Sequence, residues 1–270
     1  MHPKLKIINE YQDFEKKWEE KSKKSAQSHP LKTLKSLPKM EGIDPSTKKN
    51  LRLKAFKYLM KHDQYRLFSK YFLDKPFKYG YKLIRSYFTK QPYLRQDDFF
   101  LYGVKSMQEF ISLLQDPERT FILGFSYCHK PFECPSGRFT DKCIHDPHHP
   151  VCSQCFIGKC CNFTSKANTK LLFIPTVHYI GEKMLEEVHN DPKKKITFLI
   201  TACELSLEMF KDFGNMLRLQ GIGVRLDGRI CNTMKAFELS EKGIKPGLTV
   251  VLDKTQQKML ELLLERKTQN

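Results

Sequence analysis

Seven of the nine cysteines in this chain lie in one stretch, and their spacing is suited to binding metal. The seven are Cys128, Cys134, Cys143, Cys152, Cys155, Cys160 and Cys161. The densest part reads CSQCFIGKC, a C-x2-C-x4-C pattern that another Cys follows directly. Four prolines and two glycines in the stretch argue against a long helix or strand. We therefore expect an irregular loop that needs disulfides or bound metal to hold it.

Metal explains this cluster better than disulfides do. The N-terminal sequence MHPKLKIINEYQDFEKKWEE has no apolar segment of the kind found in secretory signals. We therefore predict a reducing, cytoplasmic compartment, where clustered cysteines serve metal binding or catalysis. Thiolates suit an iron–sulfur cluster held by four cysteines, and they also suit zinc. Buried, inert cysteines are the remaining interpretation, but seven in one polar loop argue against it.

The spacing favours an iron–sulfur cluster, and we predict a [4Fe–4S] centre with zinc as the alternative. Zinc fingers usually show two matched pairs of ligands, whereas this loop has one C-x2-C pair. We predict that Cys152, Cys155 and Cys160 ligate one centre and that Cys128 joins them. One four-ligand centre uses only four of the nine cysteines, and the others are left for a second centre or as reactive thiols. All nine therefore remain candidate metal ligands.

The net charge of +17 is concentrated in the first third of the chain. Residues 1–100 contain 24 Lys and Arg against 11 Asp and Glu, and residues 101–270 contain 23 against 19. Any anionic partner should therefore meet the N-terminal part. No window has the 18 or more apolar residues of a membrane span. We predict a cytoplasmic protein without a transmembrane segment, either free or peripheral at a membrane.

Residues 51–90 combine cations with aromatic and aliphatic side chains. Phe77, Tyr81, Ile84 and Phe88 fall at helical spacing, on a helix that is separated near Asp74–Pro76 from an earlier one. Three interpretations stay open. The cations contact nucleic-acid phosphates, the helices lie on an anionic membrane surface, or the apolar faces pack on the protein's own core and the lysines are only solvated.

Composition divides the chain into three segments. Residues 1–50 combine a charged helix with a Ser-, Lys- and Pro-rich linker over 25–46. Residues 51–118 form the basic, aromatic-rich helical region, which contains a helix opened by a capping box at Ser106. Residues 119–270 form a cysteine-rich α/β domain that we expect to bind metal.

Residues 119–270 alternate between predicted strands and helices. The predicted strands are 121–125, 171–175, 196–201, 222–226 and 248–252, and the predicted helices are 181–189, 204–220, 232–242 and 255–267. This pattern predicts an α/β fold, a mostly parallel sheet with helices on both faces. Gly221 is expected to end the 204–220 helix. The cysteine loop is expected over the C-terminal edge of the sheet.

Cys128, Cys203 and Cys231 each follow a different predicted strand. Parallel strands end at a common edge, where α/β proteins bind their ligands. We therefore predict that these three sulfurs meet beside the Cys152–Cys161 loop. The same edge carries Glu204, Arg225, Asp227 and Arg229. Cys203 and Cys231 are the candidate reactive thiols, and the N-terminus of the helix next to Cys203 is expected to lower its pKa; silent packing is the alternative.

Four stretches resemble the family called domain of unknown function 116. They read YCHKPFECPSGRFTDKC, CSQCFIGKC, ITACELSL and GIGVRLDGRICNT, within residues 121–252. That family is described as carrying seven cysteines, and some members are described as membrane-associated. The resemblance implies a metal-centred domain and no particular reaction. The positions that carry over are Cys128, Cys134, Cys143, Cys152, Cys155, Cys160 and Cys203, with Cys231 less securely.

Two functions from different classes follow. The first is a redox or sulfur-handling enzyme, or its accessory, with an iron–sulfur cluster and with Cys203 or Cys231 as an extra ligand or a reactive thiol. The second is a zinc-stapled binding module whose basic helices contact nucleic acid or an anionic membrane. Walker A, H-E-x-x-H and G-x-S-x-G motifs do not occur, so nucleotide hydrolysis, zinc proteolysis and serine hydrolysis have no support.

Overall fold

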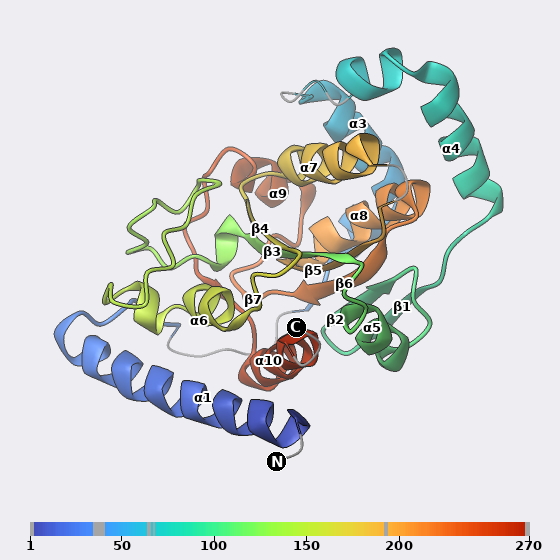
Figure 1. Cartoon of the computed structure of the whole chain (residues 1–270). Coiled ribbons are helices and arrows are strands. Elements are labelled where there is room, and N and C mark those ends of the chain that lie inside the picture. Colours follow the sequence, from blue (N-terminus) through green and yellow to red (C-terminus); the bar gives the residue numbers. More distant parts are fainter. Residues whose placement is uncertain (1–2, 35–40, 64–65, 67, 192–193, 268–270) are drawn as a thin grey trace.

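Helices and strands alternate along most of the chain in the computed structural model (Figure 1), which describes residues 3–34, 41–63, 66, 68–191 and 194–267. The helices are α1 (Pro3–Ser28), α2 (Pro45–Lys48), α3 (Leu51–Lys61), α4 (Pro76–Phe88), α5 (Met107–Leu114), α6 (Phe156–Phe163), α7 (Val177–Asn190), α8 (Glu204–Leu217), α9 (Met234–Ser240) and α10 (Asp253–Lys267), with a π-helical segment η1 (Phe68–Leu73) and the 3-10 turns η2 (Tyr127–His129) and η3 (Cys152–Gln154). The strands are β1 (Tyr93–Gln96), β2 (Phe99–Tyr102), β3 (Thr120–Ser126), β4 (Thr169–Ile174), β5 (Ile196–Ala202), β6 (Gln220–Arg225), β7 (Asp227–Gly228) and β8 (Thr249–Val250).

A mostly parallel sheet is the centre of the fold. Within the described residues it has six strands in the order β1-β2-β6-β5-β3-β4. β6, β5, β3 and β4 are parallel, while β2 pairs antiparallel with β6 and β1 with β2. In register, Phe125 lies opposite Thr201, which lies opposite Val224, so β3, β5 and β6 end together. The predicted α/β architecture is confirmed.

Alternate side chains of each strand enter opposite layers of the molecule. On β2, Phe99 and Leu101 belong to one buried cluster, and Phe100 and Tyr102 belong to the other. The first cluster includes side chains of α5, α6 and α10, and the second includes side chains of α7 and α8 (Figure 1). Because both faces of the central strands are covered, their sequences are continuously apolar.

The hairpin of β1 and β2 is not among the elements predicted from the sequence. Its two strands have four residues each, and so short an apolar run is hard to distinguish from a turn of helix. It takes the place beside β6 and joins the 51–118 segment to the sheet of the 119–270 segment. The strand expected over 248–252 is shortened to β8, which pairs with β7 in a separate two-stranded sheet.

The end of α8 also differs from the prediction. The helix stops at Leu217, and Arg218 takes the left-handed conformation with φ of 56°. Gly221, which was expected to end this helix, lies in β6 instead. A Cβ at that position would come within 2.3 Å of the Phe198 carbonyl oxygen. Gly221 therefore permits a close approach of two strands rather than a helix stop.

The N-terminal segments form the expected helices. The charged helix and the capping box are confirmed, since α1 covers the first and the Ser106 side chain accepts from the Glu109 N–H. Residues 35–40 of the predicted linker lie outside the described residues. The break near Asp74–Pro76 is confirmed, because it separates η1 from α4. None of the helices in the described part of the chain has the length and hydropathy of a membrane span.

Candidate metal and thiol site

Cys128, Cys203 and Cys231 meet at the carboxyl edge of the sheet, as predicted from their places after three strands. All three are buried in the same core cluster. The Cys203 thiol donates a hydrogen bond to Cys231, and the charge of Cys128 would act on both. Their neighbour His129 packs against Phe156 at the start of α6 in a tilted arrangement, with ring centroids 5.7 Å apart. The strand-end thiols therefore lie next to the cysteine loop.

Cys231 is the acidic thiol of this group, contrary to the prediction for Cys203. The hydrogen bond from Cys203 lowers the pKa of Cys231 most, and the Lys245 ammonium, 3.1 Å from the Cys231 Sγ, lowers it further against the effect of burial. The pKa of Cys203 is raised, because it donates to Cys231 and because it is buried. The neighbouring Cys231 thiolate thus raises the pKa of Cys203 by more than the N-terminus of α8 lowers it.

A lowered pKa keeps the Cys231 thiolate populated at mildly acidic pH, where an ordinary Cys is protonated, so small alkylating reagents should modify it there even though its 4% exposure slows their access. Lys245→Met should raise that pKa and lower the iodoacetamide rate at about pH 6.5 by roughly tenfold, with a smaller effect near pH 9. Peptide mass spectrometry measures the rate. The exposed Lys242 provides the matched Lys242→Met control. If the ratio of the labelling rate at about pH 6.5 to that near pH 9 is the same in Lys245→Met as in the wild type, Cys231 is not the acidic thiol.

Four loop cysteines line one small cavity, which we call the cysteine pocket. They are Cys134, Cys143, Cys152 and Cys155. Lys130, His145 and the apolar Ile157 complete much of the wall, and the volume is about 10 Å³. Burial, with a smaller effect of the nearby Cys143, raises the pKa of Cys152 to about 11 and that of Cys155 to about 12. Without metal the Cys152 and Cys155 thiols are therefore protonated at neutral pH.

The loop contains a helix that was not expected. α6 begins at Phe156 with Cys155 as its N-terminal cap residue, so the prediction of irregular structure is wrong for residues 156–161. Gly158 does not interrupt this helix. A Cβ at Gly158 would come within 2.3 Å of the Cys152 carbonyl oxygen, so the glycine lets α6 lie directly against the turn η3.

Cys160 and Cys161 lie on α6 and are buried, but neither lines the cysteine pocket. Cys160 belongs to the main core and lies near Tyr11 of α1. Cys161 lies closer to the pocket, since the charges of Cys143 and Cys155 would act on it. All nine cysteines are free thiols. The structure therefore groups Cys155 with the pocket thiols, and Cys160 does not line the pocket although the charge of Cys155 would also act on it.

Two cations hold the loop between β3 and α6. Lys130, only 1% exposed, donates to the carbonyl oxygens of Gly137, Thr140 and Lys142 at 3.3, 2.9 and 2.6 Å. The half-buried Arg138 donates to the carbonyl oxygens of Cys128, Lys130, Lys245 and Gly247 at 3.1, 3.1, 2.9 and 2.7 Å. Arg138 thereby ties the cysteine loop to the segment that carries Lys245. No sequence signal marks either residue, because Lys and Arg are ordinary in a polar loop.

α1 covers the outer side of the loop (Figure 1). Glu15 pairs with Lys159 at 2.7 Å, and the Gln154 amide donates to the His29 carbonyl oxygen at 2.8 Å. The ring of Phe14 lies 5.1 Å from that of Phe163 on α6. The N-terminal helix is therefore part of the structure around the cysteines.

A buried ion network lies beside Cys203. Arg225, 2% exposed, contacts Glu204 at 3.2 Å and Asp227 at 3.3 Å, and Arg95 of β1 contacts Glu204 at 3.0 Å. The predicted crowding of charges at this edge is confirmed for these residues, whereas Arg229 is exposed. The network fixes the start of α8 against the sheet, since breaking a buried pair leaves an uncompensated charge.

Metal ligation by the nine cysteines stays a prediction. Within the described ranges, no group of three or more His, Cys, Asp or Glu side chains is arranged to hold a metal ion. Comparison with protein-family models, with curated proteins and with solved structures finds no significant match. The resemblance to domain of unknown function 116 therefore also stays a prediction.

Proposed function

We propose that this chain is a thiolate metal protein whose centre is held by Cys134, Cys143, Cys152 and Cys155, with Cys231 as a reactive thiol at the same edge of the sheet. The observation that carries the proposal is the convergence of four cysteines on one cavity. Thiolates bind soft metals, which fits this donor set. This ligand set replaces Cys160 and Cys128 of the sequence prediction with Cys134 and Cys143.

An iron–sulfur cluster is the first candidate for the metal centre. The four pocket cysteines read C-x8-C-x8-C-x2-C, with a single close pair, whereas zinc modules usually have two. Zinc is the second candidate, because a cavity of about 10 Å³ is closer to the size of one ion than to that of a cluster. A cluster requires the four thiols to move apart.

The thiols at the strand ends support a redox or sulfur-handling role. An iron–sulfur cluster supplies one-electron chemistry when bound. Cys203 and Lys245 hold Cys231 as a thiolate, which is the nucleophilic form of the side chain. Arg138 bonds the carbonyls of Lys130 and Lys245, and so ties the cysteine loop to the residue that contacts the Cys231 thiol.

Anaerobic purification, metal analysis and absorption spectroscopy test this proposal. We expect brown protein with iron, acid-labile sulfide and broad visible absorption. Colourless protein with stoichiometric zinc would instead support a zinc-stapled binding module. Protein that retains neither metal, even after reconstitution with iron and sulfide or with zinc, would contradict a metal centre.

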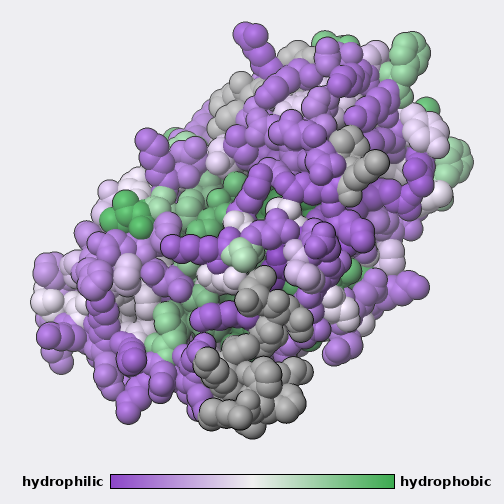
Figure 2. All heavy atoms as spheres, in the orientation of Figure 1, coloured by the Kyte–Doolittle hydropathy of each residue, from purple (hydrophilic) through white to green (hydrophobic). Residues whose placement is uncertain are grey.

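The exposed face of α4 supports a second function, contact with an anionic membrane surface. Phe77, Tyr81, Ile84 and Phe88 are 92%, 64%, 61% and 78% exposed. The interpretation that these side chains pack on the core is therefore wrong for α4, where Tyr79 alone is buried. Figure 2 shows apolar surface among hydrophilic surface along the edge where α4 lies in Figure 1. Apolar side chains beside cations are typical of an interfacial helix.

Removing the aromatic side chains of α4 should weaken membrane binding. Phe77→Ser combined with Phe88→Ser should reduce sedimentation with phosphatidylglycerol vesicles at least about tenfold, because two buried rings contribute on the order of 3 kcal/mol. Leu239→Ser, at an exposed apolar position of α9, is the control. Equal sedimentation of the double variant and the wild type would contradict membrane contact. DNA binding that survives the double change would favour nucleic acid as the partner.

A further inference from the structure

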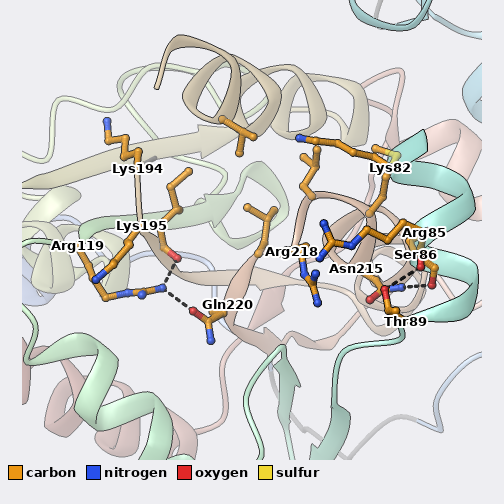
Figure 3. Close-up of a pocket in the computed structure, with 15 residues that line it drawn as sticks. Lys82, Arg85, Ser86, Thr89, Arg119, Lys194, Lys195, Asn215, Arg218 and Gln220 are labelled. Carbon is orange, nitrogen blue, oxygen red and sulfur yellow. Dashed lines mark hydrogen bonds between the residues drawn. The ribbon is translucent and has the colours of Figure 1, made fainter. Parts of the chain in front are cut away.

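A second cavity lies at the opposite edge of the sheet, at the amino ends of β5 and β6, and has a volume of about 330 Å³ (Figure 3). α4 contributes Ser86 to its wall, Thr89 follows at the end of that helix, and α8 contributes Asn215. Six lining residues are cationic and none is acidic. The cations are Lys82, Arg85, Arg119, Lys194, Lys195 and Arg218. We call this cavity the cationic pocket.

Two of these cations are already used by the fold. Arg119 donates to the Thr197 hydroxyl, the Ile196 carbonyl and the Gln220 side chain at 2.6, 2.9 and 2.8 Å. Lys194 pairs with Glu187 at 2.8 Å. Among the residues that the structure describes, the other four cations of the pocket have no carboxylate at ion-pair distance. They are Lys82, Arg85, Lys195 and Arg218, and they come from three separate segments of the chain (Figure 3).

The conformation of Arg218 adds an independent observation. Its φ of 56° lies in the left-handed region, which favours Gly or Asn and is unusual for a long side chain. The position ends α8, where a Gly would relieve the strain. Arg218 instead places a guanidinium in the wall of the pocket. Strained residues of this kind often mark binding sites.

Among the described residues, no acidic side chain lines the cationic pocket to balance its positive charge. Burial lowers the pKa of Lys82, and the charge of the neighbouring Lys78 lowers it further. A bound anion would oppose both effects, because an opposite charge within a few ångströms favours the ammonium form. The pocket is therefore electrostatically prepared for a ligand with several negative charges.

We propose that the cationic pocket binds a phosphate ester with at least two negative charges, held by Lys82, Arg85, Lys195 and Arg218. Guanidinium groups match phosphate oxygens in a two-pronged contact, and lysines add point charges. A volume of about 330 Å³ is that of a small-molecule site. The ester is either a soluble molecule or a lipid head group, since α4 forms one wall and also carries the exposed apolar face.

Inorganic pyrophosphate is the probe that tests the site. The full-length wild type should bind it in a calorimetric titration at low salt. The double variant Lys195→Gln, Arg218→Asn should raise the dissociation constant at least about tenfold. Asn tolerates the left-handed conformation, so this variant should keep its fold and its melting temperature. Lys166→Gln, at an exposed lysine that is not among the pocket's lining residues, should bind as the wild type does.

Two vesicle measurements distinguish the sources of the ester. If pyrophosphate displaces the protein from phosphatidic acid vesicles, and the double variant binds them weakly, the pocket holds a lipid head group. If the variant loses pyrophosphate binding but sediments with vesicles as the wild type does, the pocket holds a soluble ester. Absence of pyrophosphate binding by the wild type at millimolar concentration, or equal binding by both proteins, would overturn the proposal.

Discussion

Replacing Cys143 by Ser should lower the metal content of the anaerobically purified protein by at least about tenfold, whereas Cys160→Ser should leave it near that of the wild type. Cys143 lines the cysteine pocket, and Cys160 lies on α6 inside the main core. Because metal binding and local folding are coupled, the Cys143 variant should also lose hydrogen-exchange protection over residues 130–155. Metal-to-protein ratios and exchange mass spectrometry measure the two effects.

Cys160→Ser is a demanding control, since it places a hydroxyl in the core and has its own cost in stability. Metal content distinguishes a residue that ligates the metal from one that only stabilises the core. The reverse result, with metal lost from Cys160→Ser and retained by Cys143→Ser, would return the centre to the C-x2-C-x4-C set of Cys152, Cys155 and Cys160. Retention of metal by both variants would exclude both ligand sets.

Arg138→Met should lower the free energy of unfolding by roughly 2–4 kcal/mol. The guanidinium donates to four main-chain carbonyl oxygens between 2.7 and 3.1 Å away, and Met keeps the length of the side chain without these bonds. Half-burial of Arg138 keeps the expected loss below that of a fully buried ion. Urea unfolding of wild type and variant, compared at equal metal content, measures the change.

Lys142→Met is the matched control, because Lys142 is an exposed cation of the same loop. It should change the free energy of unfolding by no more than about 0.5 kcal/mol. A loss below about 1 kcal/mol in Arg138→Met would show that the loop does not depend on this guanidinium. The rate at which iodoacetamide labels Cys231 in the Lys245→Met variant should also change when Arg138→Met is added, since Arg138 bonds the Lys245 carbonyl.

The α/β architecture and the meeting of the strand-end cysteines were determined by the sequence itself. Continuous apolar strands that alternate with helices require a sheet covered on both faces. In such a sheet the parallel strands end together, so Cys128, Cys203 and Cys231 follow to one edge from their positions alone. These inferences depend on local periodicity, which a short window of sequence already contains.

The tertiary structure decided which thiols form a group and which of them is acidic. Cys134 and Cys143 reach the pocket because Lys130 and Arg138 fold the loop through contacts with main-chain carbonyls. Cys231 is acidic because the Cys203 thiol donates to it and because Lys245, fourteen residues away, returns to within 3.1 Å of it. The exposure of α4 likewise depends on what lies beside the helix and not on its own apolar pattern. Such contacts join residues that are distant or irregularly spaced, and neither the spacing of cysteines nor the period of a helix encodes them.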